Sequence, residues 1–141
     1  MPNVQAQTRP YNPRMTSDPQ RDLRQALLTL HGQLLAAQVV EMEKATGHTM
    51  NPNEQLSAAL GDPRFAWLRS LSGLIAAIDA EAADPDEVDP AQPPALDRLQ
   101  SLLNPPDPDT EFGKRYLREL QLNPSAVLAH RDVTALLESL E

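Results

Sequence analysis

The sequence predicts an all-α fold, a single-domain bundle of four or five helices. Aromatic residues make up only 4% of the chain, so the core must consist mostly of Leu, Ile, Val and Ala. Leucine-rich segments with few β-branched residues favour helix over sheet. An Asp or Asn followed by Pro is typical of a helix start, because the Asx oxygen caps a first-turn amide and Pro presets φ. Five of the expected helix starts have such a pair, at 18–19, 51–52, 62–63, 107–108 and 123–124.

Composition narrows the class of protein further. With 40% hydrophobic and 23% charged residues, the 141-residue chain can build a core of its own. The absence of cysteine excludes disulfides, thiolate catalysis and cysteine-ligated metals. A net charge of −8 argues against nucleic acid and against an anionic membrane as partner. No long apolar run or N-terminal apolar region is present, which predicts a cytoplasmic protein without membrane contact.

Residues 1–17 are polar, rich in proline and without periodicity, which predicts a mobile N-terminal tail ahead of the helical domain at 18–141. Arg9 and Arg14 meet no acidic residue before Asp18. A basic arm that grips an acidic partner is therefore the alternative interpretation of this segment.

The longest predicted helix runs from about 19 to 46, and Gly47 is expected as its left-handed C-cap. Its apolar residues form two adjoining stripes, so the helix should contact more than one neighbour, or a second copy of the chain. Three polar residues lie within or beside these stripes, and packing alone does not explain them: His31, Gln38 and Glu41.

The segment at about 63–79 is expected to be the central, buried helix, with the first and last helices as its main neighbours. Large side chains occupy one side and small ones the other, and a helix that is apolar nearly all round is usually buried. Gly73 lowers helix propensity, which close approach by another backbone would explain. The alternative is an exposed face on which Trp67, with Arg69 in the neighbouring polar sector, serves as a docking anchor.

The remaining segments are shorter. Asn51 and Glu54 form a capping-box-like start to a helix that ends at Gly61. The segment at about 80–94 contains several acids, several prolines and no base, which predicts an acidic, extended linker. Three helices are expected after this linker, an amphipathic one ending at Asn104 and two that begin at 107–108 and 123–124.

The search for chemistry gives few candidates. His31 and Glu41 are ten residues apart, or roughly 15 Å along a helix axis, so they cannot share a metal ion. His130 could approach His31 only if the first and last helices pack together. Known metal, nucleophile and phosphate-loop motifs do not occur. We therefore expect no metal and no cofactor, and an enzyme is not favoured. The basic cluster around Arg115 is interleaved with acids, which is typical of a solvated helix face.

The segment DPRFAWLRSLSGLIAAID, followed by FGKRYLRELQLNPSAVLAH, resembles small uncharacterised bacterial all-helical proteins with a DPxFAWLRxLSxLI core. The resemblance runs from the first helix to His130 and leaves out the tail and the acidic linker. It implies a bacterial, all-helical protein. Because that group has no established activity, the resemblance assigns no functional residue.

Two hypotheses for function follow. The first is a non-enzymatic interaction or accessory protein that binds a protein partner, with a homodimer as one form. The second is a small-ligand-binding protein, or an enzyme, that uses a polar cluster of His31, Gln38, Glu41 and His130. The second hypothesis requires these four side chains to converge on a pocket.

Overall fold

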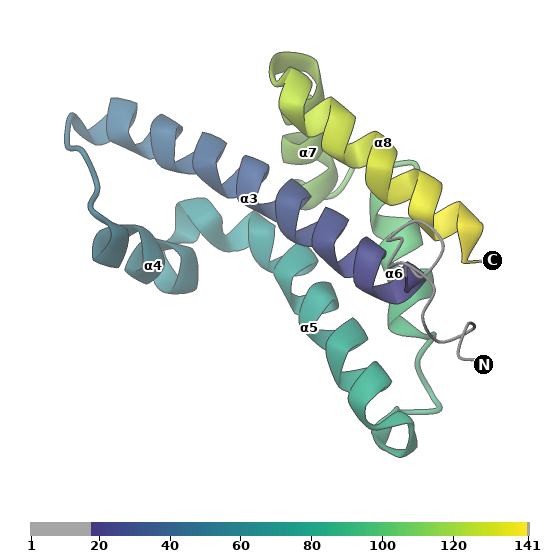
Figure 1. Cartoon of the computed structure of the whole chain (residues 1–141). Helices are drawn as coiled ribbons and strands as arrows, with labels where there is room; N and C mark the ends of the chain where they lie inside the picture. The colour runs from purple at the N-terminus through teal and green to yellow at the C-terminus, as the bar shows by residue number, and fades with distance from the viewer. Residues whose placement is uncertain (1–17, 141) are drawn as a thin grey trace, which may run out of the picture.

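The computed structural model describes residues 18–140, and there the prediction of an all-α bundle is confirmed (Figure 1). The predicted tail at 1–17, with Arg9 and Arg14, lies outside the described residues. Within them, six α-helices and two short 3-10 helices occur: α3 (Pro19–Thr46), α4 (Pro52–Gly61), η1 (Pro63–Leu68), α5 (Arg69–Ala83), η2 (Pro85–Glu87), α6 (Ala95–Leu103), α7 (Glu111–Leu122) and α8 (Pro124–Ser139).

Helix α3 is the spine of the bundle. Asp18 caps its first turn and Gly47 ends it with a φ of 72°, which confirms both predicted boundaries. It packs most extensively along α8, and it also contacts η1 and α5 (Figure 1). The face that α3 turns to these neighbours carries its buried residues, Leu23, Leu27, Leu30, Leu34, Gln38 and Val39.

The segment expected to be the central helix differs from the prediction. It begins as η1 and continues as α5 to Ala83. It packs on the first helix, α3, as expected, but its other main neighbour is α6 rather than the last helix, α8. Only its side of large residues is buried, while Ala66, Ser70 and Gly73 are exposed. A Cβ added at Gly73 would meet no atom within 4 Å, so no neighbouring backbone explains this glycine. The side with large residues has more apolar area than the side with small ones, so its burial is more favourable, and it faces the core.

Local sequence signals set most helix starts. Asn51 and Glu54 form the predicted capping box, since the Asn51 Oδ1 accepts from Glu54 N and the Glu54 Oε1 accepts from Asn51 N. The start predicted at 107–108 is wrong. Thr110 caps α7 instead, because its hydroxyl accepts from Gly113 N at 2.9 Å.

The acidic linker is shorter than predicted, because α5 continues to Ala83. The side chain of Glu81, in the last turns of α5, accepts from Ala95 N at the start of α6. The same carboxylate pairs with Arg98 at 3.6 Å. One side chain therefore joins the two ends of the linker.

Candidate functional site

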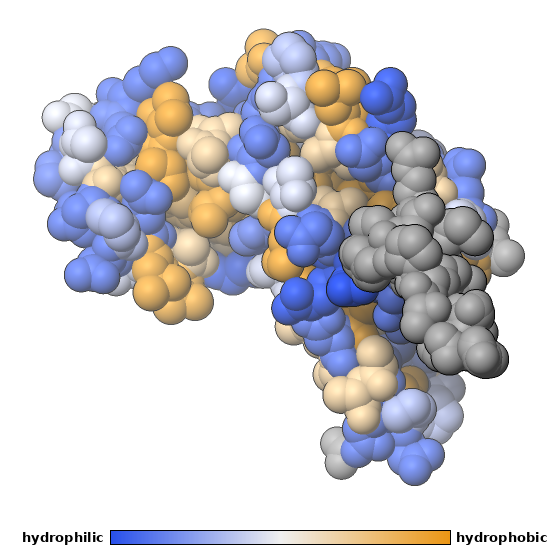
Figure 2. Space-filling model, viewed as in Figure 1, coloured by the Kyte–Doolittle hydropathy of each residue, from blue (hydrophilic) through white to orange (hydrophobic). Residues whose placement is uncertain are grey.

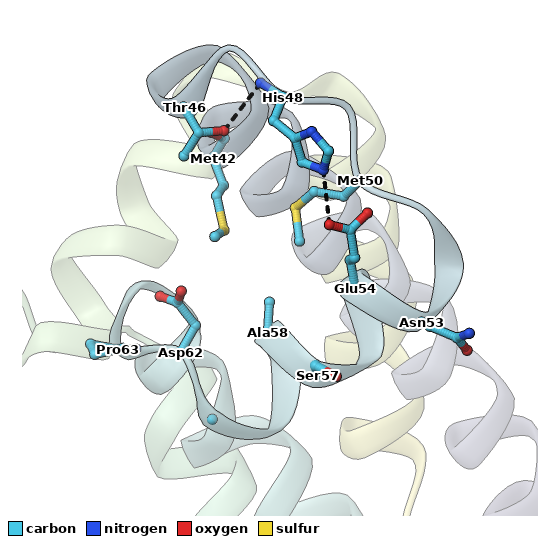
Figure 3. A pocket seen from close by; sticks show the side chains of 11 residues that line it. Met42, Thr46, His48, Met50, Asn53, Glu54, Ser57, Ala58, Asp62 and Pro63 are labelled. Atoms are coloured by element: carbon cyan, nitrogen blue, oxygen red, sulfur yellow. Dashed lines mark hydrogen bonds and ion pairs between the residues drawn. The ribbon is translucent and has the colours of Figure 1, made fainter.

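The end of α3, the connection after it, α4 and the start of η1 enclose an open groove of about 630 Å³ (Figure 3). We call it the α3/α4 groove. Figure 1 shows why it forms, since α4 lies apart from the main bundle and approaches it at η1. The residues that define the groove come from these four segments, and those most important to its chemistry are Met42, Met50, Glu54, Ser57, Ala58 and Asp62.

The floor of the groove is apolar. Met42, Met50 and Ala58 approach its centre from different segments, as Figure 3 shows. Met50 and Ala58 are buried, while Met42 is half-buried against the core. Methionine side chains are unbranched and polarisable, so a floor of this kind can adapt its shape to an apolar group placed upon it.

The rim of the groove is polar and ordered by hydrogen bonds. His48 Nε2 lies 2.8 Å from Glu54 Oε2, across the connection between α3 and α4. Met50 N donates to Glu43 Oε2 at 2.8 Å, which fixes the backbone of the same connection. The hydrogen bond from Asn51 N, with a smaller contribution from His48, lowers the pKa of Glu54. Glu54 is therefore ionised at neutral pH.

Helix α4 also carries apolar residues on the side away from the groove floor. Leu56 and Leu60 are 60% and 72% exposed, and they lie four residues apart on one helix face. Glu54 is the only ionisable residue of α4. A helix of this length is marginally stable without tertiary contacts. In the space-filling view, apolar residues form a band at this end of the molecule, inward of hydrophilic residues at its tip (Figure 2).

Trp67 does not form an exposed docking anchor. It is 6% exposed, and its Nε1 donates to Gln38 Oε1 at 2.9 Å inside the core. This hydrogen bond explains the polar residue on the apolar face of α3, although the Nε2 of Gln38 donates to no acceptor within residues 18–140. Arg69 is exposed, and its Nη2 donates to the carbonyl of Asp62 at the corner between α4 and η1.

His130 has a separate partner in the core. Its Nδ1 lies 2.6 Å from the hydroxyl of Tyr116, which burial keeps neutral by raising its pKa. The rings of Trp67, Phe112, Tyr116 and His130 follow one another at centroid distances of 5.8, 5.1 and 5.4 Å. We call these four residues the aromatic row. It links α7 to η1 and α8, which assigns Tyr116 and His130 a structural role.

The four residues proposed as a ligand site do not form one cavity. Glu41 lies 3.8 Å from Arg115 and 3.7 Å from Arg118, on the exposed side of α7. His31 is half-buried on α3, and desolvation lowers its pKa. Neither residue, nor Gln38 or His130, lines the α3/α4 groove or either of two smaller cavities, one between α3 and α8 and one between α5, α6 and the segment before α7.

Sequence reasoning missed the groove. Met42 lies in the amphipathic helix α3 and Met50 in the connection after it, and neither position by itself indicates a groove. One feature of the sequence does indicate an interaction surface near the groove: the helix at 52–61 has two leucines and only one ionisable residue. A surface helix usually has more charged residues on its solvent-exposed face. The direction of α4 relative to α3 could not be derived from that signal.

Comparison with known proteins gives no relative, since no family model, curated protein or solved structure matches the chain. The fold and the groove define the class: an α-helical protein with an open apolar groove at one end. Within residues 18–140, no group of three or more His, Asp or Glu side chains is arranged to hold a metal ion. No helix of that range combines the length and hydropathy needed to cross a bilayer.

Burial of His130 makes stability depend on pH. Its pKa is lowered by desolvation, so just below its ordinary value the unfolded chain binds a proton that the folded chain does not. The contribution of neutral, buried His130 to the free energy of unfolding is therefore complete above about pH 6.5. It is lost as the pH falls through the lowered pKa of the folded protein. We expect His130→Gln to reduce the decline in unfolding free energy between about pH 7.5 and about pH 5.5. Urea titrations measure this, and equal declines in both proteins would contradict it.

Proposed function

We propose that the protein is a non-enzymatic interaction protein that binds a segment of a partner protein in the α3/α4 groove. The observation that carries this proposal is the apolar floor of the open groove. Two exposed leucines on the other side of α4, a helix with one ionisable residue, add to the apolar surface at this end of the bundle. Contiguous exposed apolar surface on a folded protein is typical of interaction sites. Such a surface is more costly to leave in water than the scattered single leucines of an ordinary surface.

The groove suits a chain segment better than a small molecule. Small-molecule sites usually enclose most of the ligand and present a few free polar groups that orient it. Here the polar side chains lie at the rim and are held by the protein's own groups, since Glu54 pairs with His48 and Asp62 accepts from Arg64 N. Each carboxylate keeps lone pairs that can accept from a further cation. The apolar floor is therefore the main source of affinity, and it is open along α4.

A homodimer is the second candidate. The observation that favours it is a separate group of exposed apolar residues near the turn between α7 and α8, namely Leu122, Val127 and Leu128. Light scattering after size exclusion tests this form. A monomer at tens of micromolar concentration would exclude it, whereas a dimer broken by Leu128→Glu would support it.

The groove function can be tested with a displayed library of helical peptides. We expect selection against the protein to yield binders whose affinity falls at least about tenfold in Ser57→Trp, because indole at this position fills the groove. The matched control is Ser101→Trp, which changes an exposed serine on α6. Binders that respond equally to both variants, or a library without binders, would overturn the proposal. Circular dichroism establishes that both variants are folded.

A further inference from the structure

Resting on the groove function above, we propose that the partner is a cationic amphipathic helix. Its large apolar side chains would lie on Met42 and Met50, and its Lys or Arg side chains would pair with Glu54 and Asp62. The proposal specifies both the shape and the charge of the occupant. Each is argued separately below.

The shape of the site favours a helix. The groove runs beside α4, whose ten residues span roughly 15 Å, the length of nearly three helical turns. Leu56 and Leu60 lie one turn apart and form a ridge on the other side of α4, outside the groove lining, so a helix in the groove would contact the floor of Met42, Met50 and Ala58. Binding of an amphipathic helix to an apolar groove is a common mode of peptide recognition, and adaptable methionines often line such grooves.

The charge of the site favours a cationic partner. Glu54 and Asp62 line the groove, and no Lys or Arg of residues 18–140 lines it. The basic residue of the lining is His48, which already contacts Glu54. Lys44 and Arg64 lie in the adjoining segments but not in the lining, and the guanidinium of Arg69 is held at the carbonyl of Asp62. The net charge of −8 would also steer a cationic partner toward the protein.

A second copy of the chain fits the groove less well. In a twofold contact, each α4 would occupy the groove of the other, since such an interface uses the same surface twice. The only ionisable side chain that α4 brings is Glu54, with Asp62 directly after the helix. Acidic rim would then face acidic rim, and juxtaposed like charges are unfavourable. The apolar ridge alone would have to offset that repulsion.

The experiment uses three synthetic helices of about 16 residues, long enough to cover α4 at roughly 24 Å. All three carry the same leucine stripe at i, i+3, i+4 and i+7, and their other positions are Lys, Gln or Glu. We expect the Lys peptide to bind about tenfold more tightly than the Gln peptide at about 50 mM salt, and this preference to shrink at about 300 mM. The Glu peptide should be weakest. Fluorescence anisotropy measures all three.

Two sets of variants locate the effect. Glu54→Gln with Asp62→Asn keeps both caps, because Gln and Asn can make the same hydrogen bonds to backbone amides. This double variant should remove the preference for Lys and leave the affinity for the Gln peptide unchanged. Ser57→Trp should weaken both peptides, whereas Ser101→Trp should weaken neither. The methyl NMR signals of Met42 and Met50 should shift when peptide binds.

The outcomes separate this inference from the groove function. If the Gln peptide binds the groove as tightly as the Lys peptide, the cationic partner is excluded and the groove function stands. If no peptide responds to Ser57→Trp, both proposals fail. If the Lys peptide binds Ser57→Trp as tightly as the wild type, its binding is unspecific attraction to an acidic protein, and the inference is overturned. A dimer that Ser57→Trp dissociates would identify a second copy as the occupant, with the same consequence.

Discussion

Replacement of Gly113 by alanine is expected to lower the free energy of unfolding by about 3 kcal/mol. Gly113 is buried in the first turn of α7, and an added Cβ would overlap the backbone carbonyl of Asp107 and lie 2.9 Å from Thr110 Oγ1. The carbonyl cannot rotate away as a side chain would. It also accepts from the amide and the hydroxyl of Thr110, so displacing it breaks the cap of α7.

Gly73→Ala is the matched control for this substitution. Gly73 is also inside a helix, but a Cβ there meets no atom within 4 Å. We expect Gly73→Ala to raise the free energy of unfolding by about 0.5–1 kcal/mol, because alanine loses less backbone entropy on folding. Urea titrations of the two variants should shift in opposite directions. A Gly113→Ala protein as stable as the wild type would contradict the close approach of Asp107.

Truncation of Tyr116 to alanine is expected to have a similar or larger effect, about 4 kcal/mol. The side chain is fully buried, and its ring lies between those of Phe112 and His130 in the aromatic row. Tyr116→Phe keeps the ring and removes the hydroxyl that lies 2.6 Å from His130 Nδ1. We expect it to cost about 1 kcal/mol, the usual net contribution of one hydrogen bond.

Thermal and urea unfolding of the two Tyr116 variants separate packing from hydrogen bonding. Val40→Ala on α3 provides a control, because this valine is 48% exposed and its truncation should cost about 0.5 kcal/mol or less. A loss below about 2 kcal/mol in Tyr116→Ala would mean that the aromatic row contributes little to the fold.

Local patterns predicted the parts of the fold that depend on local forces. The bounds of α3 follow from Asp18 and Gly47, and the start of α4 follows from Asn51 with Glu54. Each is an interaction within about one helical turn, so neighbouring sequence contains the information. At 107–108 the same reasoning failed, since Thr110 competed as a cap for the same helix.

The packing of the helices on one another, and with it the candidate site, was less predictable from the sequence than the helix ends. The pattern identified Gln38 and His130 as polar residues that packing alone did not explain, yet their partners Trp67 and Tyr116 come from other helices. The groove depends on the corner near Asp62, which sets the direction of α4. Periodicity describes faces of single helices and contains no information about angles between them.

The carboxylate of Glu81 has a consequence for how this chain can vary. Since it binds Ala95 N and Arg98, the residues between α5 and α6 form a loop that starts and ends at the same place. The entropy needed to close such a loop grows slowly, by roughly 0.6 kcal/mol for each doubling of its length. Insertions at this position would leave the helices in register. The loop at 84–94 is thus a natural point for lengthening the chain, or for adding a second folded unit, without rebuilding the bundle.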